Sequence, residues 1–305
     1  MKFNFFYILI MMFIHCAEDI ETVQSYNLIS QFDSDSSLSI ITWNVEWFPK
    51  DTNTINYMAE IIIDLNADIL ALQEITNSDD FNLLVSEINK LDNDNIWIGY
   101  RSSESNYQEL AYIIKSNSIT IINNPYEILK SYSSTFAFRE PYVLEFKYMN
   151  EDFILFNNHY KCCGDGILED DSDDEEYRRM RSNILIEEYI ANNFDNDNVI
   201  LVGDFNDDLM DTNINNVFNI FINQPSKYKF VDIEIASGPS INWSYPSWPS
   251  HLDHILISNE LFDEFENSES KVETIMAELF FLRGWIDYDT FISDHRPVGI
   301  IIKIN

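Results

Sequence analysis

Polar side chains stand at the ends of the apolar runs that we expect to form strands in this chain of 305 residues. The set comprises Asn44, Glu74, His159, Asp204, Asn206, Asp253, Asp294 and His295. Taken one at a time, each suits a turn or a cap, where Asp and Asn are common. Together they present a carboxylate, an amide or an imidazole at several strand edges, and α/β proteins bind ligands at strand ends. We therefore expect them to form one shared site.

The residue types in this set suit metal-assisted hydrolysis of a phosphate ester. Glu74 and Asp294, with the amide of Asn44, offer the hard oxygen ligands that Mg²⁺ and Mn²⁺ prefer. Two histidines and two further carboxylates suit proton transfer, and asparagine N–H groups can donate to a phosphoryl oxygen where charge develops. Because the sequence has no GxSxG motif and no P-loop, we expect attack by a metal-assisted water.

The stretch NNHYKCCGDG (157–166) sets His159 beside two adjacent cysteines, Cys162 and Cys163. A zinc site is disfavoured, because closed zinc sites need four well-spaced ligands and the chain has no second cysteine cluster. Adjacent cysteines can close only a strained ring. A vicinal disulfide that stiffens the turn and a pair of free thiols are therefore both open alternatives.

The apolar pattern predicts the elements that must position these residues. Continuous apolar runs at 68–75 and 198–205 predict strands buried on both faces, and the β-branched run at 38–45 predicts another strand. The expected helices, from apolar spacing, span 54–65, 79–90 and 178–193, and the other expected strands span 96–100, 109–115, 118–123, 142–149, 152–159, 254–258 and 297–304. With no repeat and no second linker, one α/β domain over 38–305 is the expectation.

Residues 1–17 have the pattern of a signal peptide. An apolar stretch at 3–14 is too short to span a bilayer and typical in length of a signal-peptide core. Cys16 follows it, so membrane attachment through a lipidated Cys16 is an alternative, although the residue before it is larger than lipoprotein signals prefer. The Ser- and Asp-rich residues 18–37 predict a polar linker. We expect an exported protein, either periplasmic, extracellular or a cell-surface lipoprotein.

The formal net charge is −34, from 52 acidic and 18 basic side chains. This balance argues against a broad basic nucleic-acid footprint and favours a soluble monomer. Residues 168–176 carry seven carboxylates in nine positions, which would repel a polyanion over about 8–10 Å at moderate salt. The same run suits the N-terminal end of the following helix, with Asp174 and Glu175 spaced to pair with Arg178 and Arg179. Ca²⁺ binding by the run is a minor alternative.

A series of motifs resembles the endonuclease/exonuclease/phosphatase superfamily. They run from about 39 to 303 and comprise TWNVEWF, LALQEI, NYQELAYII, FAFREPYVLEF, NNHYK, VGDFND, HLDHILIS and ISDHRPV. VGDFND and SDH are specific as a pair, whereas QE alone is weak. The triplets REP (139–141) and YQE (107–109) are most similar to the deoxyribonuclease I branch. The resemblance implies a four-layer αββα sandwich, in which two packed β-sheets are flanked by helices and the site lies at one edge.

The resemblance also implies metal and phosphate ligands. Glu74 would be the principal ligand of Mg²⁺ or Mn²⁺, and Asp294 and Asn44 would help to hold metal and phosphate. Asn206 would bind the phosphoryl oxygen, and Arg139 would grip a phosphate.

Acid–base roles follow from the same resemblance. His295, oriented by Asp253, would be the general base, and His159, oriented by Glu109, would protonate the leaving oxygen. Asp204 would position or deprotonate the water. A carboxylate beside each imidazole should raise its pKa and fix its tautomer.

Three functions are compatible with these features. The first is an exported, metal-dependent endonuclease that cleaves DNA or RNA. The second is a phosphodiesterase or phosphatase of the same fold, acting on phospholipid in the manner of a sphingomyelinase or on a small phosphate ester. The third is a non-catalytic cell-surface binding protein, which the complete set of site residues disfavours. Trp243, Tyr245 and Trp248 could stack on bases, touch lipid or simply pack under their loop.

Overall fold

A computed structural model describes residues 36–102 and 108–304 of the chain. The predicted signal peptide, Cys16, Tyr107 and most of the predicted linker lie outside the described residues. The first strand begins at Ser37, where the predicted linker ends. Among the described residues, no helix is long and apolar enough to span a membrane.

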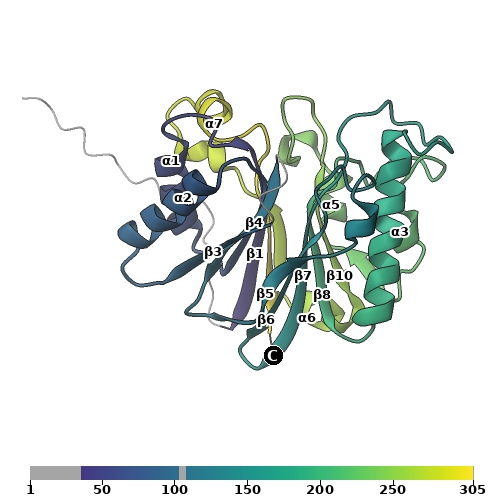
Figure 1. Cartoon of the computed structure of the whole chain (residues 1–305), viewed down its shortest axis with the longest axis horizontal. Helices are drawn as coiled ribbons and strands as arrows, with labels where there is room; N and C mark the ends of the chain where they lie inside the picture. Colours follow the sequence, from purple (N-terminus) through teal and green to yellow (C-terminus); the bar gives the residue numbers. More distant parts are fainter. Residues whose placement is uncertain (1–35, 103–107, 305) are drawn as a thin grey trace, which may run out of the picture.

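Two six-stranded sheets stack face to face between helical layers, as Figure 1 shows. The first sheet has the strand order β11-β12-β1-β2-β4-β3 and the second has the order β5-β6-β7-β8-β10-β9. Their strands are β1 (Ser37–Phe48), β2 (Ile69–Ile75), β3 (Trp97–Arg101), β4 (Glu109–Lys115), β5 (Ile119–Glu127), β6 (Tyr142–Tyr148), β7 (Glu151–His159), β8 (Asn198–Asp204), β9 (Tyr228–Phe230), β10 (Asp253–Ser258), β11 (Lys271–Thr274) and β12 (Val298–Lys303). The architecture confirms the predicted αββα sandwich.

Helices cover the outer face of each sheet. In Figure 1, α1 and α2 lie outside the first sheet, and the long α3 lies outside the second. The α-helices are α1 (Thr54–Leu65), α2 (Ser78–Leu91), α3 (Glu175–Asn193), α4 (Asn219–Ile222), α5 (Ile233–Ala236), α6 (Phe262–Phe265) and α7 (Trp285–Phe291). Four 3₁₀ turns span Lys130–Tyr132, Ser240–Asn242, Asn259–Leu261 and Ala277–Phe280.

Three apolar clusters fill the spaces between the four layers. One joins α1 and α2 to the first sheet, one lies between the two sheets, and one joins α3 to the second sheet. The middle cluster draws on alternate residues of the central strands, such as Leu38 and Ile40 of β1. Side chains of a strand alternate between its two faces, and the other face of β1 carries Ile41, Trp43 and Val45 in the first cluster, so both faces of β1 are buried.

Most element boundaries agree with the sequence predictions within a few residues. Helix α3 begins three residues earlier than expected, because the side chain of Asp174 accepts a hydrogen bond from the Tyr177 amide at 2.7 Å and caps the helix. Strands β9 and β11 and helices α4 to α7 were not predicted. Each spans seven residues or fewer, which is too short to show a clear period.

The strand directions bring the predicted site residues to one edge of the sandwich. Strands β1 and β2 are parallel, as are β7 and β8. The carboxyl end of each pair therefore carries polar residues, and His159 lies opposite Asp204 in the register of β7 and β8. Strand β10 runs antiparallel and starts with Asp253 opposite Asp204. The buried Asn157 amide donates to the Leu72 carbonyl at 3.0 Å and ties the two sheets together close to this edge.

Candidate active site

Asp204, at the end of β8, is the centre of the cluster. Its Oδ2 accepts a hydrogen bond from Asn44 Nδ2 at 3.0 Å. The Nε2 atoms of two imidazoles lie close to the same oxygen, at 3.6 Å for His159 and 3.8 Å for His295. Burial raises the Asp204 pKa to about 6, the charge of His295 opposes this shift, and the charge of Asp253 adds to it. The structure thus brings both predicted histidines to one buried carboxylate.

Glu74 closes the cluster from the first sheet. Its backbone has a φ of 65°, a conformation that non-glycine residues adopt rarely and that is frequent at functional sites. Its Oε1 accepts from Asn44 Nδ2 at 3.2 Å and lies 3.8 Å from His159 Nε2, and its Oε2 accepts from the Trp47 amide at 3.0 Å. The carboxylate of Glu74 is therefore held facing His159.

Asn44 presents its amide nitrogen to the two carboxylates. Its Oδ1 accepts from the Glu46 amide at 3.0 Å, which fixes the side-chain orientation. The Nδ2 atom therefore points into the site and can donate to a substrate oxygen, as expected for phosphate binding. The oxygen faces a backbone amide, so this orientation does not support the expected metal-ligand role of Asn44.

His295 is paired with Asp253, as the resemblance implied. His295 Nδ1 lies 2.8 Å from Asp253 Oδ2, and the ring of Tyr245 packs on the imidazole with centroids 4.8 Å apart. Burial alone would lower the pKa of His295, but the charges of Asp253, Asp204 and Asp294 outweigh it and raise the pKa to about 10. These neighbouring carboxylates therefore favour the protonated form of His295.

His159 lacks the carboxylate partner that was expected. Its Nδ1 is buried without a hydrogen-bond partner, and the Glu109 Oε2 instead lies 2.5 Å from Arg101 Nη1 on the neighbouring strand β3. The structure therefore shows no hydrogen bond from His159 Nδ1 to Glu109, and the predicted orienting role of Glu109 stays a prediction. Burial, followed by the charges of Arg139 and His295, lowers the His159 pKa well below its ordinary value, so His159 is neutral at neutral pH.

The guanidinium of Arg139 is hydrogen-bonded to the backbone at His159 and Tyr160. Its guanidinium donates to the carbonyls of His159 at 3.2 Å and Tyr160 at 2.7 Å and to Gln108 Oε1 at 2.5 Å. Asn206 Nδ2 also donates to the Tyr160 carbonyl, at 3.2 Å. Both residues lie at the site, where they hold the end of β7, and only their remaining N–H groups are left to bind a phosphate.

Asp294 lies at the rim of the site with a neighbour that the sequence analysis missed. Its backbone amide donates to Glu46 Oε2 at 2.9 Å, and burial followed by the charge of Asp294 raises the Glu46 pKa against the influence of Lys50. The signal was present in TWNVEWF, where Glu46 follows Asn44 by two residues. Ser293 was missed as well: its hydroxyl donates to the Asn44 carbonyl at 2.6 Å and accepts from the His295 amide at 2.9 Å, which fixes the turn before β12.

One group of acidic and imidazole side chains at the site could hold a cation. Asp204, Asp253 and His295 form one group of buried ligand atoms within 4.8 Å of one another. Glu74 and Asp294 do not belong to such a group of three or more among the described residues. The carboxylates of Glu74, Asp204, Asp253 and Asp294 form no ion pair with lysine or arginine in the described part of the chain.

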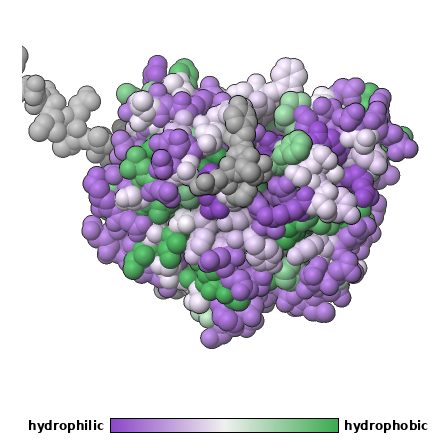
Figure 2. Space-filling model, in the orientation of Figure 1, coloured by the Kyte–Doolittle hydropathy of each residue, from purple (hydrophilic) through white to green (hydrophobic). Residues whose placement is uncertain are grey.

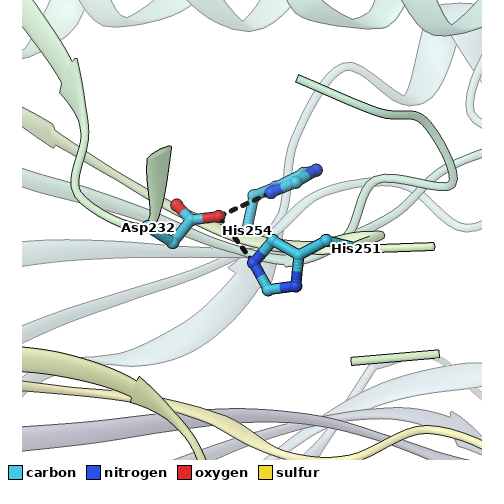
Figure 3. Close-up of side chains that lie close together, drawn as sticks. All are labelled: Asp232, His251 and His254. Carbon is cyan, nitrogen blue, oxygen red and sulfur yellow. Dashed lines mark hydrogen bonds and ion pairs between the residues drawn. The ribbon is translucent and has the colours of Figure 1, made fainter. Parts of the chain in front are cut away.

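A second buried cluster lies behind the site (Figure 3). Asp232 Oδ2 lies 3.0 Å from His251 Nε2 and 2.6 Å from His254 Nδ1, and His254 Nε2 lies 2.9 Å from the Asp207 carbonyl. His251 Nδ1 accepts from the Ser244 amide. Because every ring nitrogen has a protein partner, this cluster is a structural link between loops rather than a metal site.

The adjacent cysteines are two free, exposed thiols with their Sγ atoms 2.9 Å apart. Buried Arg179 holds the loop that carries them, because its Nη1 donates to the carbonyls of Lys161 at 2.8 Å and Cys163 at 2.7 Å. The same guanidinium pairs with Asp207 at 2.6 Å. The expected pairing of Arg179 with Glu175 is replaced by this contact and by one with Glu176 at 3.0 Å.

The aromatic loop 241–251 divides into packed and exposed parts. Trp243 Nε1 donates to the Ile235 carbonyl at 3.0 Å, and Tyr245 packs on His295. A short bridge between Tyr245 and Ser250 closes the loop, and Trp248 within it is 78% exposed. Trp248 is therefore the aromatic side chain of this loop that a substrate can reach most easily.

Solved structures share this fold over most of the chain. TDP2 from D. rerio, solved with a single-stranded DNA product, matches with a TM-score of 0.64 and 15% identity, over 88% of this chain and 100% of that one. The human Nocturnin catalytic domain, solved with a bound sulfate anion, matches with a TM-score of 0.61 and 15% identity, over 88% and 94%. An endonuclease/exonuclease/phosphatase family protein from Bacteroides thetaiotaomicron matches with a TM-score of 0.60 and 14% identity, over 90% of this chain and 100% of that one.

The sequence itself also identifies the family. No curated protein sequence matched the chain. The sequence profile of the Endonuclease/Exonuclease/phosphatase family matches residues 41–295, the span that contains all the site residues described above. This protein belongs to the endonuclease/exonuclease/phosphatase family.

Proposed function

We propose that the protein is a metal-dependent phosphodiester hydrolase and that its substrate is a nucleic acid strand. The observation that carries the proposal is the convergence of two imidazoles on one carboxylate oxygen, with His159 Nε2 and His295 Nε2 at 3.6 Å and 3.8 Å from Asp204 Oδ2. The two rings favour opposite protonation states. A site with one proton donor and one proton acceptor is suited to hydrolysis, in which a water loses a proton and a leaving oxygen gains one.

The carboxylates of the site have the chemistry to hold a divalent cation. Glu74 and Asp294 would hold the ion, as the resemblance implies, because hard oxygen ligands suit Mg²⁺ and Mn²⁺. Glu46 lies next to Asp294. Glu74 and Asp294 form no ion pair with a lysine or arginine among the described residues. A bound cation would offset their negative charge. When bound, it would supply charge stabilisation to the phosphoryl oxygens.

The directions of the pKa shifts exchange the acid and base roles that the resemblance implies. His295, kept protonated by Asp253, is prepared to donate its Nε2 proton to the leaving oxygen. His159, kept neutral by burial, is prepared to accept a proton from the attacking water. The Nδ2 of Asn44 donates toward the phosphoryl oxygen, and Arg139 fixes the backbone that carries His159.

Two observations support a nucleic acid substrate over a small ester. The exposed Trp248 lies in the loop whose Tyr245 packs on His295, and an exposed aromatic ring next to a catalytic site can stack on a base. TDP2, which has the same fold, was solved with a single-stranded DNA product. Residues 1–17 support the further proposal that the protein acts after export, which fractionation of cells that express the full chain would test.

Exposed apolar side chains favour a phospholipid as the alternative substrate. Leu282 is 97% exposed, Trp248 78% and Ile286 62%. Ile286 belongs to α7, which lies close to the carboxyl-terminal half of β1, because the Tyr288 hydroxyl of α7 accepts a hydrogen bond from Trp43 Nε1 at 2.9 Å. Such side chains could enter a membrane surface.

A panel of substrates tests the proposal. The purified protein is assayed with Mg²⁺ or Mn²⁺ against plasmid DNA, RNA, sphingomyelin vesicles and bis(p-nitrophenyl) phosphate, with EDTA and His295→Ala as controls. We expect cleavage of DNA or RNA that requires the metal and the imidazole. Cleavage of sphingomyelin alone would support the alternative, and no cleavage of any diester would refute the proposal.

A further inference from the structure

Three of the seven arginines in the chain have no carboxylate partner among the described residues. Four form ion pairs with acidic side chains at 3.0 Å or less, namely Arg101, Arg179, Arg283 and Arg296. The other three are Arg139, Arg178 and Arg181, and no ion pair joins them to an acid in the described part of the chain. In a chain with 52 acidic residues, arginines without an acidic partner are unexpected. Positive charges that lie close together repel each other, and an anion between them removes this repulsion.

Arg178 and Arg181 line one pocket of about 330 Å³ beside α3. Its opposite wall is formed by Ser134, Thr135 and Phe138 from the turn that precedes Arg139. The two hydroxyl groups can donate hydrogen bonds, and Phe138 is 60% exposed and offers a ring face. Guanidinium and hydroxyl donors around one space are the chemistry that binds a phosphate.

The turn that lines the pocket leads directly into Arg139, which contacts the end of β7. Phe138 precedes Arg139, whose guanidinium donates to the carbonyls of His159 and Tyr160. Arg178 donates to the Ser134 carbonyl and so fixes the turn to α3. Burial lowers the pKa of Arg139, and the charge of Arg178 lowers it further. The negative charges of Asp204 and Glu74 act in the opposite direction. Arg178 and Arg181 line one pocket, and the turn that forms the rest of its wall leads directly into Arg139.

We propose that Arg178 and Arg181, with the hydroxyls of Ser134 and Thr135, form a second phosphate subsite that holds a phosphate flanking the scissile one on the same nucleic acid strand. The subsite rests on the proposed function, because it names the part of the substrate that this function leaves open. A ring face at Phe138 beside the two arginines suits the sugar or base attached to that phosphate.

The acidic run before α3 competes with this phosphate. Asp173 lines the same pocket but forms no ion pair with either arginine. Its charge acts against an anion over about a Debye length. The binding should therefore strengthen in Asp173→Asn, which removes one negative charge and keeps the side-chain size.

Binding of a fluorescent oligonucleotide tests the subsite. The probe is a labelled single strand of about eight nucleotides, within the usual range of single-strand site sizes, and a second probe carries uncharged methylphosphonates at the linkages around its centre. Anisotropy is measured with Mg²⁺ in the His295→Ala background, where cleavage is slow. The arginines are replaced together (Arg178→Gln/Arg181→Gln), and the control Lys90→Gln/Lys227→Gln removes the same charge at exposed sites outside the pocket.

We expect the double arginine replacement to weaken binding of the charged probe by about 10- to 100-fold, the usual size for lost charge-assisted contacts. The slope of the logarithm of the binding constant against the logarithm of salt concentration should become shallower by roughly the equivalent of one to two phosphate contacts. The preference for the charged over the methylphosphonate probe should disappear in the same variant. The lysine control should change binding by less than about threefold, since it acts only through screened long-range charge. Arg181→Gln alone, which removes no described hydrogen bond, should show part of the effect with an unchanged unfolding temperature.

Several outcomes separate this proposal from the proposed function. If the wild-type protein binds the probe through the arginines but cleaves no diester, the phosphate-binding role of the arginines stands, and the hydrolase proposal fails together with the position of this phosphate next to a scissile one. If it cleaves DNA or RNA and the arginine variants bind as tightly as the wild type, the hydrolase proposal stands and the subsite is wrong. The subsite is also wrong if the wild-type protein does not bind the charged probe, or if the lysine control weakens binding as much as the arginine pair.

Discussion

At the residue scale, the two histidines favour different protonation states because the charged residues around them differ, although both rings lie beside the same carboxylate. Both lie within 4 Å of the same Asp204 oxygen. Asp253 hydrogen-bonds His295 at 2.8 Å and favours its charged form. His159 has Arg139 nearby instead, and Glu109 is engaged with Arg101. Identical side chains are thereby prepared for opposite proton transfers.

The substitution Asp253→Asn should lower the pKa of His295 and slow hydrolysis by about 10²-fold or more, as expected when a general acid loses its proton too early. With His295 as the acid, the rate falls as pH rises through the pKa of that imidazole, so the alkaline limb of the pH–rate profile should move to lower pH. The ring resonances of His295 and the profile measure both effects. Asp263→Asn removes the same charge on α6 as the control, and an unmoved alkaline limb in Asp253→Asn would contradict the assigned role.

At the element scale, buried polar contacts fasten the loops behind the site. His254 on β10 contacts Asp232 at 2.6 Å (Figure 3). Its Nε2 lies 2.9 Å from the Asp207 carbonyl, so it joins the start of β10 to the loop after β8. Burial would lower the His254 pKa, but the charge and hydrogen bond of Asp232 outweigh it and raise the pKa. In turn His254 and His251 hold the Asp232 pKa low despite burial.

The His254–Asp232 pair should make stability fall at alkaline pH. A histidine whose pKa is raised on folding stabilises the fold fully below its unfolded pKa of about 6.5, and this contribution is lost as pH rises through the folded pKa. The free energy of unfolding of the wild type and His254→Gln, measured in urea from about pH 5 to pH 9, should therefore converge as pH rises. A difference that is constant over this range would exclude a charged His254.

Gly203 in β8 should tolerate no side chain. Its φ is 147°, and a Cβ atom there would lie 2.0 Å from the Asn158 carbonyl oxygen on β7. We expect Gly203→Ala to cost about 3 kcal/mol or more, from strain and the separation of two paired strands. Gly166→Ala is the matched control, because its φ is also positive, at 77°, but no atom lies within 4 Å of the added Cβ. Equal unfolding free energies for the two variants would contradict this explanation.

The sequence predicts helices and strands well where the apolar pattern extends over many residues. It predicts the site residues that stand at the ends of strands. Strand β4 and helix α1 have the predicted bounds, and the His295–Asp253 contact follows from the motifs. The Arg101–Glu109 pair was not predictable, because it depends on the antiparallel register that sets Arg101 opposite Ala111. Glu46 was missed although it stands in the motif TWNVEWF, because its contact with the Asp294 amide depends on a tertiary turn that the sequence does not show.

At the scale of the whole molecule, the acidic charge opposes both folding and the binding of a polyanion. Hydrophilic groups dominate the face in Figure 2, and the net charge is −34. Charge of one sign destabilises a compact state through self-repulsion. Of the three arginines without an acidic partner among the described residues, Arg139 contacts the end of β7 at the active site, and Arg178 and Arg181 line the pocket of the proposed phosphate subsite.

Salt should therefore stabilise the fold while it weakens strand binding. Raising NaCl to about 0.3 M, where the Debye length is below about 8 Å, should raise the unfolding temperature by several degrees and weaken oligonucleotide binding at the same time. Calorimetry and anisotropy on the same samples measure the two effects. An unfolding temperature that falls with added NaCl would show that attractive ion pairs outweigh the net repulsion.

The most direct test of the two-histidine mechanism compares two oligonucleotides, one with a normal scissile phosphate and one with sulfur in place of the leaving oxygen. A thiolate leaves without a proton, so it does not need a general acid. With Mg²⁺, His295→Ala should slow cleavage of the normal strand by about 10²–10⁴-fold and cleavage of the sulfur-bridged strand much less, whereas His159→Ala should slow both alike. Equal losses on both strands in His295→Ala, or no metal-dependent cleavage of either strand by the wild type, would contradict the mechanism.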